Sequence, residues 1–227
     1  MILKYEYANR IINRIHNSDV LYSNITNLCY ESIVNGFYGI EVFPNMVELC
    51  SKITKDTNVK ILALIAYPHG TFLAEQKRYE ILDVLSAGAN GVNVCINCLN
   101  ARSGVWDLIL EEMCQAREAS AGKFLNYIIE MEYLNDEQIL KCCEAALEAK
   151  IDGIITSTGL YNTLDKDKND VPIWITENDV KKIKGAVGDN VKVIAQGYVR
   201  SKEKAESLIK AGADYLGIEN AIPFTVD

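Results

Sequence analysis

The chain has 227 residues, of which 49% are hydrophobic and 24% charged, and its formal net charge is −8 at pH 7. This length is enough for one substantial core, and the acidic balance argues against binding to nucleic acid or to an anionic membrane. No apolar run approaches the ~18 residues of a transmembrane helix, and the N-terminal segment is too polar for a signal peptide. We therefore expect a cytoplasmic protein whose seven cysteines are free thiols.

One pattern recurs along the chain: an amphipathic segment ends, a glycine or another small residue follows, and a short apolar run begins. A glycine after a helix supplies a left-handed C-cap. The Val/Ile-rich run after it is typical of a strand buried on both faces of a parallel sheet. The pattern appears at 35–43, 86–97, 148–157 and 210–220, each of which holds a helix end followed by a strand. Further strands are predicted at 58–67, 123–131 and 190–197, with a weaker first strand at 12–16.

Helical periodicity fills the segments between these strands. In chain order the predicted helices are 24–35, 71–88, 105–120, 135–150, 176–187 and 201–212, with Asn135, Thr176 and Ser201 as N-caps. Strict alternation without a second zone of composition predicts an α/β fold, a single (β/α)8 TIM barrel over residues 1–227. A doubly wound open sheet is the alternative, but no Gly-rich phosphate loop follows the first strand.

Polar residues near the carboxyl ends of the strands are the candidate site, because the chemistry of a barrel gathers there. The polar loop 161–172, after the sixth strand, lies at the same end. Glu41 is costly to bury unless it is paired, and Asn93 and Asn97 are expected on one strand face. The other candidates are Tyr67, Glu130, Ser157, Gly159, Gln196, Gly197, Glu219 and Asn220.

The cysteine and histidine patterns indicate no redox, metal or cofactor site. Cys95 and Cys98 form a C-x-x-C, but they lie in an apolar strand-like run, whereas a redox pair needs a helix N-terminus. The two histidines show no metal-ligand spacing with each other or with cysteine.

Six segments, in order, resemble the deoxyribose-phosphate aldolase family. They are AYPHG (66–70), NVCINCLN (93–100), NYIIEMEYLNDEQI (126–139), DGIITSTG (152–159), IAQGYVR (194–200) and ADYLGIENA (213–221). The resemblance extends from about residue 28 to residue 221. It implies a (β/α)8 barrel, in agreement with the periodicity, and a small-molecule substrate.

The resemblance also implies a catalytic set that this chain lacks. In the family one lysine forms a Schiff base with the aldehyde donor, a second lowers the pKa of the first by like-charge repulsion, and an aspartate takes part in proton transfer. The matching positions here are Ile155, Ile194 and Asn93. Neither isoleucine can form an imine, and asparagine cannot exchange a proton at neutral pH.

The phosphate end implied by the resemblance is altered too. Gly159 and Gly197 match strand-end glycines of the family, but Tyr198 replaces a second glycine, and Glu219-Asn220 replaces a pair of hydroxyl residues. A carboxylate beside a phosphate repels it. We therefore expect a substrate without phosphate.

These observations favour an enzyme that keeps the barrel but works without an imine. Glu41 and Glu130 would be the acid–base groups, assisted by Asn93, in a lyase, condensation, cyclisation or isomerisation step on a small polar metabolite of biosynthesis. One alternative is a non-catalytic sensor or partner protein. Another is a true aldolase using Lys192, which lies two residues before Ile194, roughly 6–7 Å deeper in the barrel. The sequence leaves open whether the chain forms a homo-oligomer.

Overall fold

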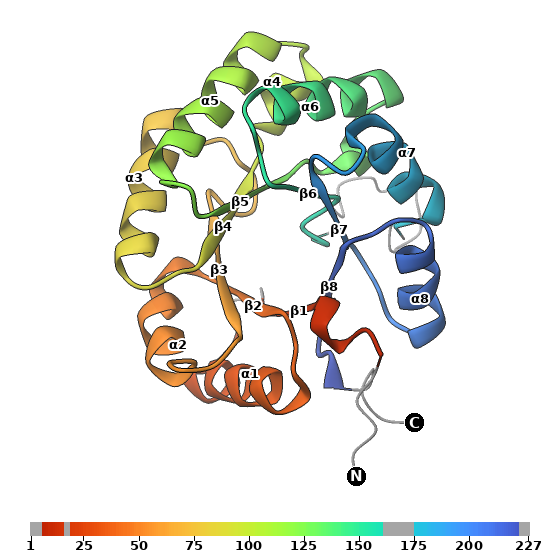
Figure 1. The fold of residues 1–227 in the computed structure, drawn as a ribbon. Helices are drawn as coiled ribbons and strands as arrows, with labels where there is room; N and C mark the ends of the chain where they lie inside the picture. The colour runs from red at the N-terminus through yellow and green to blue at the C-terminus, as the bar shows by residue number, and fades with distance from the viewer. Residues whose placement is uncertain (1–5, 16–18, 161–174, 223–227) are drawn as a thin grey trace.

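Eight parallel strands close into a barrel in which each strand pairs with the next and β8 returns to β1 (Figure 1). The computed structural model describes residues 6–15, 19–160 and 175–222, so the polar loop predicted at 161–172 lies outside the described residues. The strands are β1 Ile11–Arg14, β2 Gly39–Val42, β3 Lys60–Ile65, β4 Gly91–Cys95, β5 Phe124–Ile128, β6 Gly153–Ile155, β7 Lys192–Gln196 and β8 Tyr215–Glu219. The predicted TIM barrel is confirmed.

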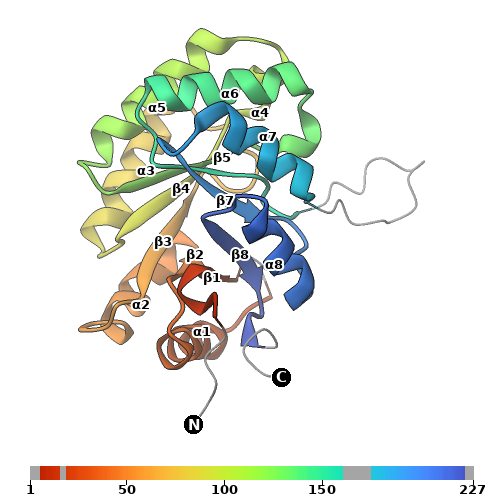
Figure 2. The ribbon, with the colours of Figure 1, turned by 45° about the vertical axis from the view of Figure 1, so that its right-hand side comes forward.

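Helices surround the strands in both ribbon views (Figures 1 and 2). Within the described ranges they are α1 Tyr22–Asn35, α2 Val47–Ile53, α3 Ala74–Ser86, α4 Cys98–Arg102, α5 Trp106–Ala119, α6 Asp136–Glu148, α7 Glu177–Val187 and α8 Lys202–Lys210. Short 3-10 turns occupy Ala8–Arg10, Pro44–Met46 and Met131–Tyr133. No helix of the described chain is long and apolar enough to cross a membrane.

The helix starts follow local capping chemistry. The side chains of Asn135, Thr176 and Ser201 each accept a hydrogen bond from the backbone N–H three residues later, so all three predicted N-caps are confirmed. The helices α2 and α4 were not predicted. They span seven and five residues, which is too short for a helical hydrophobic period to stand out.

Two apolar layers hold the barrel together. The larger lies between strands and helices, and the smaller fills the lumen with Ile12, Leu62, Leu64, Cys95, Ile128, Ile155 and Ile194. At the amino ends of the strands, Tyr38, Phe124 and Tyr215 close the lumen, with the Tyr38 and Tyr215 ring centroids 4.2 Å apart. This packing leaves the carboxyl ends as the polar end of the lumen.

Candidate active site

A buried arginine occupies the polar end of the lumen. Arg14 is the last residue of β1, and its side chain is 2% exposed. Its Nε donates to Glu41 Oε1 at 2.8 Å, and its Nη1 donates to the carbonyl oxygen of Thr158 at 2.8 Å. One side chain therefore ties β1 both to β2 and to the segment that follows β6. Burial lowers the pKa of Arg14, but the combined effects of Glu41, Tyr67 and Glu219 outweigh it and raise the pKa overall.

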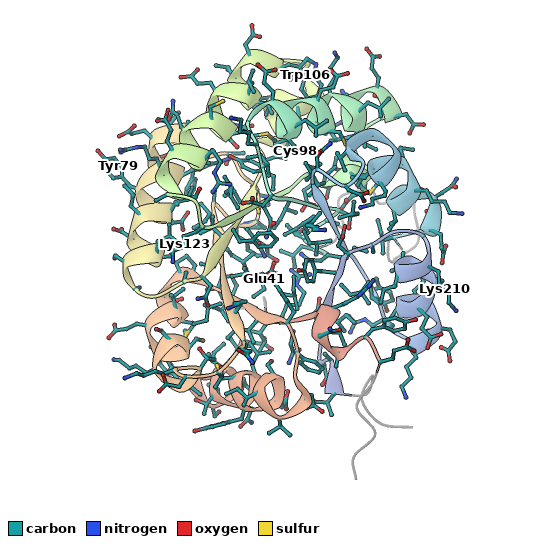
Figure 3. The ribbon with its side chains drawn as sticks, viewed as in Figure 1. Glu41, Tyr79, Cys98, Trp106, Lys123 and Lys210 are labelled. Carbon is teal, nitrogen blue, oxygen red and sulfur yellow. The ribbon has the colours of Figure 1, made fainter. Side chains whose placement is uncertain are left out.

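Glu41 begins a line of hydrogen bonds across the lumen. It is fully buried, and it lies at the centre of the barrel in Figure 3. Its Oε2 accepts from Asn93 Nδ2 at 2.6 Å, and Asn93 Oδ1 in turn accepts from Asn126 Nδ2 at 2.8 Å. Both oxygens of Glu41 are thus engaged, one by Arg14 and one by Asn93.

This line of polar groups ends in atoms without a partner. Among the described residues, the buried atoms Arg14 Nη2, Asn126 Oδ1 and Gln196 Oε1 make no hydrogen bond. A buried polar group left unsatisfied costs about 1–3 kcal/mol. Such groups are uncommon in folded proteins, and each one is a candidate contact for a ligand.

A second carboxylate pair lies where β5 and β6 end. Glu130 is 6% exposed, and its Oε1 accepts from the backbone N–H of Thr158 at 2.6 Å. Nearby, Glu132 Oε1 accepts from the Ser157 hydroxyl at 2.6 Å, and the same hydroxyl oxygen accepts from the Gly159 N–H at 3.0 Å. The hydroxyl residues after β6 are therefore held by two acidic side chains.

Glu130 and Glu132 perturb each other. Burial, followed by repulsion from the Glu132 carboxylate, raises the pKa of Glu130 well above its usual value. Burial also raises the pKa of Glu132, against the lowering effect of the Ser157 hydroxyl. Sharing one proton between two neighbouring carboxyls relieves such repulsion. Glu130 also lines a cleft of about 810 Å³ at the barrel mouth, together with His69, Arg102 and Thr158.

The segment after β6 is also bound to β7. Thr156 Oγ1 donates to the Gln196 carbonyl oxygen at 2.5 Å and accepts from the Gln196 N–H at 2.9 Å. The Gln196 side chain donates from Nε2 to the carbonyl oxygen of Ser157 at 2.9 Å. Gly217 makes room for it, since a Cβ at that position would lie 2.1 Å from Gln196 Oε1.

Below these polar groups the lumen is aliphatic. Ile155 of β6 and Ile194 of β7 are register partners, and both side chains are fully buried in the lumen cluster. Gly153 sits beneath them, where a Cβ would lie 2.6 Å from Ile194 Cδ1 and 2.3 Å from Asn126 Oδ1. Neither isoleucine side chain offers a polar atom to a ligand.

The two residues at the end of β8 line a second hollow. Glu219 and Asn220 join Arg14 around a cavity of about 280 Å³ that is lined by the ends of β1 and β8 and by helix α1. The Arg200 guanidinium lies 3.5 Å from Glu219 Oε2 and 4.6 Å from the centre of the Tyr198 ring. Arg200 therefore balances the charge that Glu219 brings to this cavity.

Strained backbone marks the mouth of the barrel. Ala66, Glu130, Tyr198 and Asn220 have positive φ angles of 53°, 49°, 54° and 50°, and each lies just after the end of a strand. Residues other than glycine adopt this conformation at a cost, and they cluster at functional sites. Gly159 and Gly197 share the same end of the barrel with φ angles of 77° and 131°.

Of three further candidates, Asn97 lies where the sequence did not predict it, whereas Tyr67 and Lys192 lie at the predicted ends of their strands. Asn97 does not share a strand face with Asn93, because β4 ends at Cys95 and Asn97 instead caps α4, accepting from the Asn100 N–H at 3.2 Å. Tyr67 follows β3, and burial raises the pKa of its phenol. Lys192 begins β7 at the opposite end of the barrel, is 45% exposed, and lies 3.1 Å from Asp214 Oδ1.

Cys98 of the C-x-x-C pair is the first residue of α4, yet neither thiol has the lowered pKa typical of a redox pair. Burial raises the pKa of Cys95 well above its usual value and that of Cys98 to about 11, so both stay protonated thiols. In the described ranges, no group of three or more His, Cys, Asp or Glu side chains is arranged to hold a metal ion.

Two residues of this candidate site were missed by sequence reasoning. Arg14 was overlooked because the first strand is short and its register was uncertain. Glu132 was overlooked because it lies in a 3-10 turn beyond the end of a strand. An arginine in an otherwise apolar strand, and a Glu-x-Glu directly after one, are the signals that could have found them.

Comparison with known proteins gives a consistent result. The deoxyribose-phosphate aldolase of Thermoanaerobacter pseudethanolicus is 34% identical over 198 residues, covering 86% of this chain and 84% of the relative. The deoxyribose-phosphate aldolase of Dictyoglomus turgidum is 30% identical over 219 residues, covering 96% of this chain and 95% of the relative. The solved structure of QR15, an aldolase, is 28% identical and aligns with a TM-score of 0.86 over 97% of this chain and 94% of that one. No protein-family model matches the chain.

Proposed function

The chain belongs to the deoxyribose-phosphate aldolase family, and from that membership we propose that it is a lyase in which general acid–base catalysis replaces the imine. Its substrate is a small polar carbonyl compound without a phosphate group. The relatives are aldolases by name, so carbon–carbon bond cleavage or formation is the reaction type that the membership favours.

The observation that carries this proposal is the environment of Glu130. Its carboxyl group is buried and hydrogen-bonded to Thr158, it has a raised pKa, and it lines the 810 Å³ cleft. A carboxyl group tuned in this way is suited to exchange a proton with a substrate near neutral pH. The pKa of Glu130 is the more strongly raised of the two, so the shared proton rests on Glu130 and passes to Glu132 when Glu130 acts as a base.

We assign Glu41 a different role from the one its sequence context suggested. Both of its oxygens already accept hydrogen bonds, one from Arg14 and one from Asn93. In this position Glu41 orients the guanidinium and balances its charge, and Asn93 fixes Glu41 in turn. The proton transfer that the sequence analysis divided between two glutamates would then fall to Glu130 and its neighbour Glu132.

The lysines support a mechanism without an imine. Ile155 and Ile194 occupy the positions where the family resemblance places the two lysines, and Lys192 is at the far end of the barrel. Lys77 is fully buried, and burial lowers its pKa. Its Nζ, however, lies 2.7 Å from the Cys95 carbonyl oxygen and 2.8 Å from Glu112 Oε1, so it is bound to α5 and to the end of β4.

Hydrogen–deuterium exchange at carbon tests this proposal with simple carbonyl probes in place of the full substrate. The protein is incubated in D2O with acetaldehyde, acetone, hydroxyacetone or pyruvate, and loss of the α-proton signal is followed by NMR. We expect exchange with at least one probe, and loss of about 10²–10⁴-fold in rate in Glu130→Gln. Glu118→Gln, at an exposed position on α5, is the control and keeps the wild-type rate.

Borohydride trapping is the complementary test. We expect no covalent adduct by intact mass after reduction with each probe. A trapped lysine would contradict the proposal. Ligand binding at the mouth without exchange or turnover would instead favour the non-catalytic sensor.

A further inference from the structure

We propose that the Nη2 amino group of Arg14 is the electrophile of this site, donating a hydrogen bond to the substrate carbonyl oxygen and stabilising the enolate that forms there. This inference rests on the proposed function. It adds a catalytic residue and defines the substrate as a neutral β-hydroxy aldehyde or ketone, or the two carbonyl compounds that combine to form one.

The first support is the inventory of donors on Arg14. Nε is used by Glu41 and Nη1 by the Thr158 carbonyl, while Nη2 is buried and has no partner in the described part of the chain. Two of the three nitrogens therefore fix the plane of the guanidinium. The third presents N–H donors at a defined point without needing to reorganise, which is the arrangement that stabilises developing negative charge.

The second support is the balance of charge. Glu41 already neutralises Arg14, and Asn93 and Asn126 next to it are neutral amides. Glu219 contributes a further negative charge within range of Arg14, since it helps to raise the arginine pKa. Arg200 balances Glu219 and Glu41 balances Arg14, so these pairs leave no surplus positive charge for a phosphate dianion, whereas a carbonyl oxygen needs only the free N–H. The guanidinium then stabilises the enolate, which carries a single negative charge for a short time.

The third support is the position of Arg14 relative to the acid–base pair. The carbonyl of Thr158 accepts from Arg14 Nη1, and the N–H of the same residue donates to Glu130. Arg14 lines the 280 Å³ cavity and Glu130 lines the 810 Å³ cleft, and Thr158, which both side chains bind, links the two. An aldol reaction needs this pairing, with an electrophile at the carbonyl oxygen and a proton carrier near the hydroxyl and the α-carbon.

The bond cleavage then balances as follows. The shared proton first passes from Glu130 to Glu132. Glu130 then removes the proton from the substrate β-hydroxyl, and the carbon–carbon bond breaks. Its electron pair passes to the carbonyl to give an enolate whose oxygen is held by Arg14 Nη2, and the hydroxyl carbon leaves as an aldehyde. Glu130 returns the same proton to the enolate carbon. No oxidant or reductant is required.

The experiment compares two variants in the exchange assay with the same four probes. Arg14→Gln/Glu41→Gln removes the cation together with its counter-charge, so that no unpaired ion remains in the lumen. Glu41→Gln keeps the cation. We expect the double variant to lose about 10²–10³-fold in exchange rate, as for removal of a donor to an oxyanion, and the single variant to lose less. Circular dichroism and urea unfolding verify that both are folded.

A carbonyl resonance gives a readout that a structural role would not move. We expect the ¹³C signal of [2-¹³C]hydroxyacetone, bound to the wild type, to shift downfield by polarisation, and this shift to be absent in the double variant. If the wild type and the double variant exchange equally while Glu130→Gln does not, the role of Arg14 is overturned and the proposed function stands. If the wild type exchanges no probe, or traps an imine, the proposed function fails and this inference fails with it.

Discussion

Arg14 and Glu41 form an ion pair that is almost completely shielded from solvent, with 2.8 Å between Nε and Oε1 and side-chain exposures of 2% and 0%. Each partner is also held from its other side, Arg14 by Thr158 and Glu41 by Asn93. The pair therefore links β1, β2, β4 and the segment after β6 at the polar end of the lumen.

Breaking this pair from one side should be costly. We expect Arg14→Gln to lower the free energy of unfolding by about 3–5 kcal/mol, because Glu41 would remain buried without its counter-charge. Arg14→Gln/Glu41→Gln should recover most of that loss. Urea denaturation followed by circular dichroism measures both, and a single variant within about 1 kcal/mol of the wild type would contradict the assignment.

The Glu130 pair should make stability fall as pH rises. The folded-state pKa of Glu130 is raised above its unfolded value, so the folded protein binds more protons there. The stability from the protonated form is complete below the usual carboxyl pKa and is lost as pH climbs through the raised value. Urea midpoints measured from pH 4 to pH 9 should decline less steeply in Glu130→Gln than in the wild type. Parallel curves for the two proteins would show that Glu130 does not titrate in this range.

Gly217 and Gly185 are a matched pair for testing how tightly the lumen is built. An added Cβ at Gly217 lies 2.1 Å from Gln196 Oε1, so Gly217→Ala should displace that side chain and cost about 1–3 kcal/mol. Gly185 lies on the exposed side of α7 with no neighbour within 4 Å. Gly185→Ala should therefore stabilise by about 0.5–1 kcal/mol through helix propensity. Thermal unfolding separates the two, and equal effects would argue against the lumen packing.

A lysine placed at position 155 should restore nucleophilic character to the lumen. We expect Ile155→Lys to give a borohydride-trapped adduct with acetaldehyde, since burial lowers a lysine pKa and frees the amine. The wild type and Lys192→Met should give none. Peptide mass mapping identifies the modified residue. An adduct that forms in the wild type and disappears in Lys192→Met would identify Lys192 as a nucleophile.

The thiols should differ sharply in reactivity. Cys114 is exposed, whereas the other six cysteines are buried or half-buried. Burial raises the pKa of Cys98 to about 11 and that of Cys143 to about 12. Labelling with Ellman's reagent at neutral pH should show one fast thiol, absent in Cys114→Ser. A second fast thiol would indicate an opening of the barrel that the structure does not contain.

Much of the fold was predictable because its signals are local. Asn135, Thr176 and Ser201 cap their helices through residues three positions away, and the alternation of apolar runs and helices determines a barrel. The helices α2 and α4 escaped because short helices have little periodicity. Glu41 could be identified as a buried carboxylate that needs a partner.

The partner of Glu41 could not be predicted in the same way. Arg14 is 27 residues from Glu41 in the sequence, and only closure of the sheet brings them together. For the same reason, sequence reasoning identified Asn93 but not Asn126, its neighbour on the next strand. The pairing of Glu130 with Glu132 depends on the turn after β5, in which Glu130 has a left-handed conformation that its sequence does not encode plainly.

The hydrogen bond from Arg14 to Thr158 joins residues 144 positions apart. During folding, Arg14 of β1 cannot donate its hydrogen bond to Thr158 until β6 has joined the barrel. Contacts of such long range form slowly. A partly completed barrel would leave the arginine and its glutamate partner exposed to water. The same contact that would organise chemistry in the finished protein thus makes its assembly depend on the chain being nearly whole.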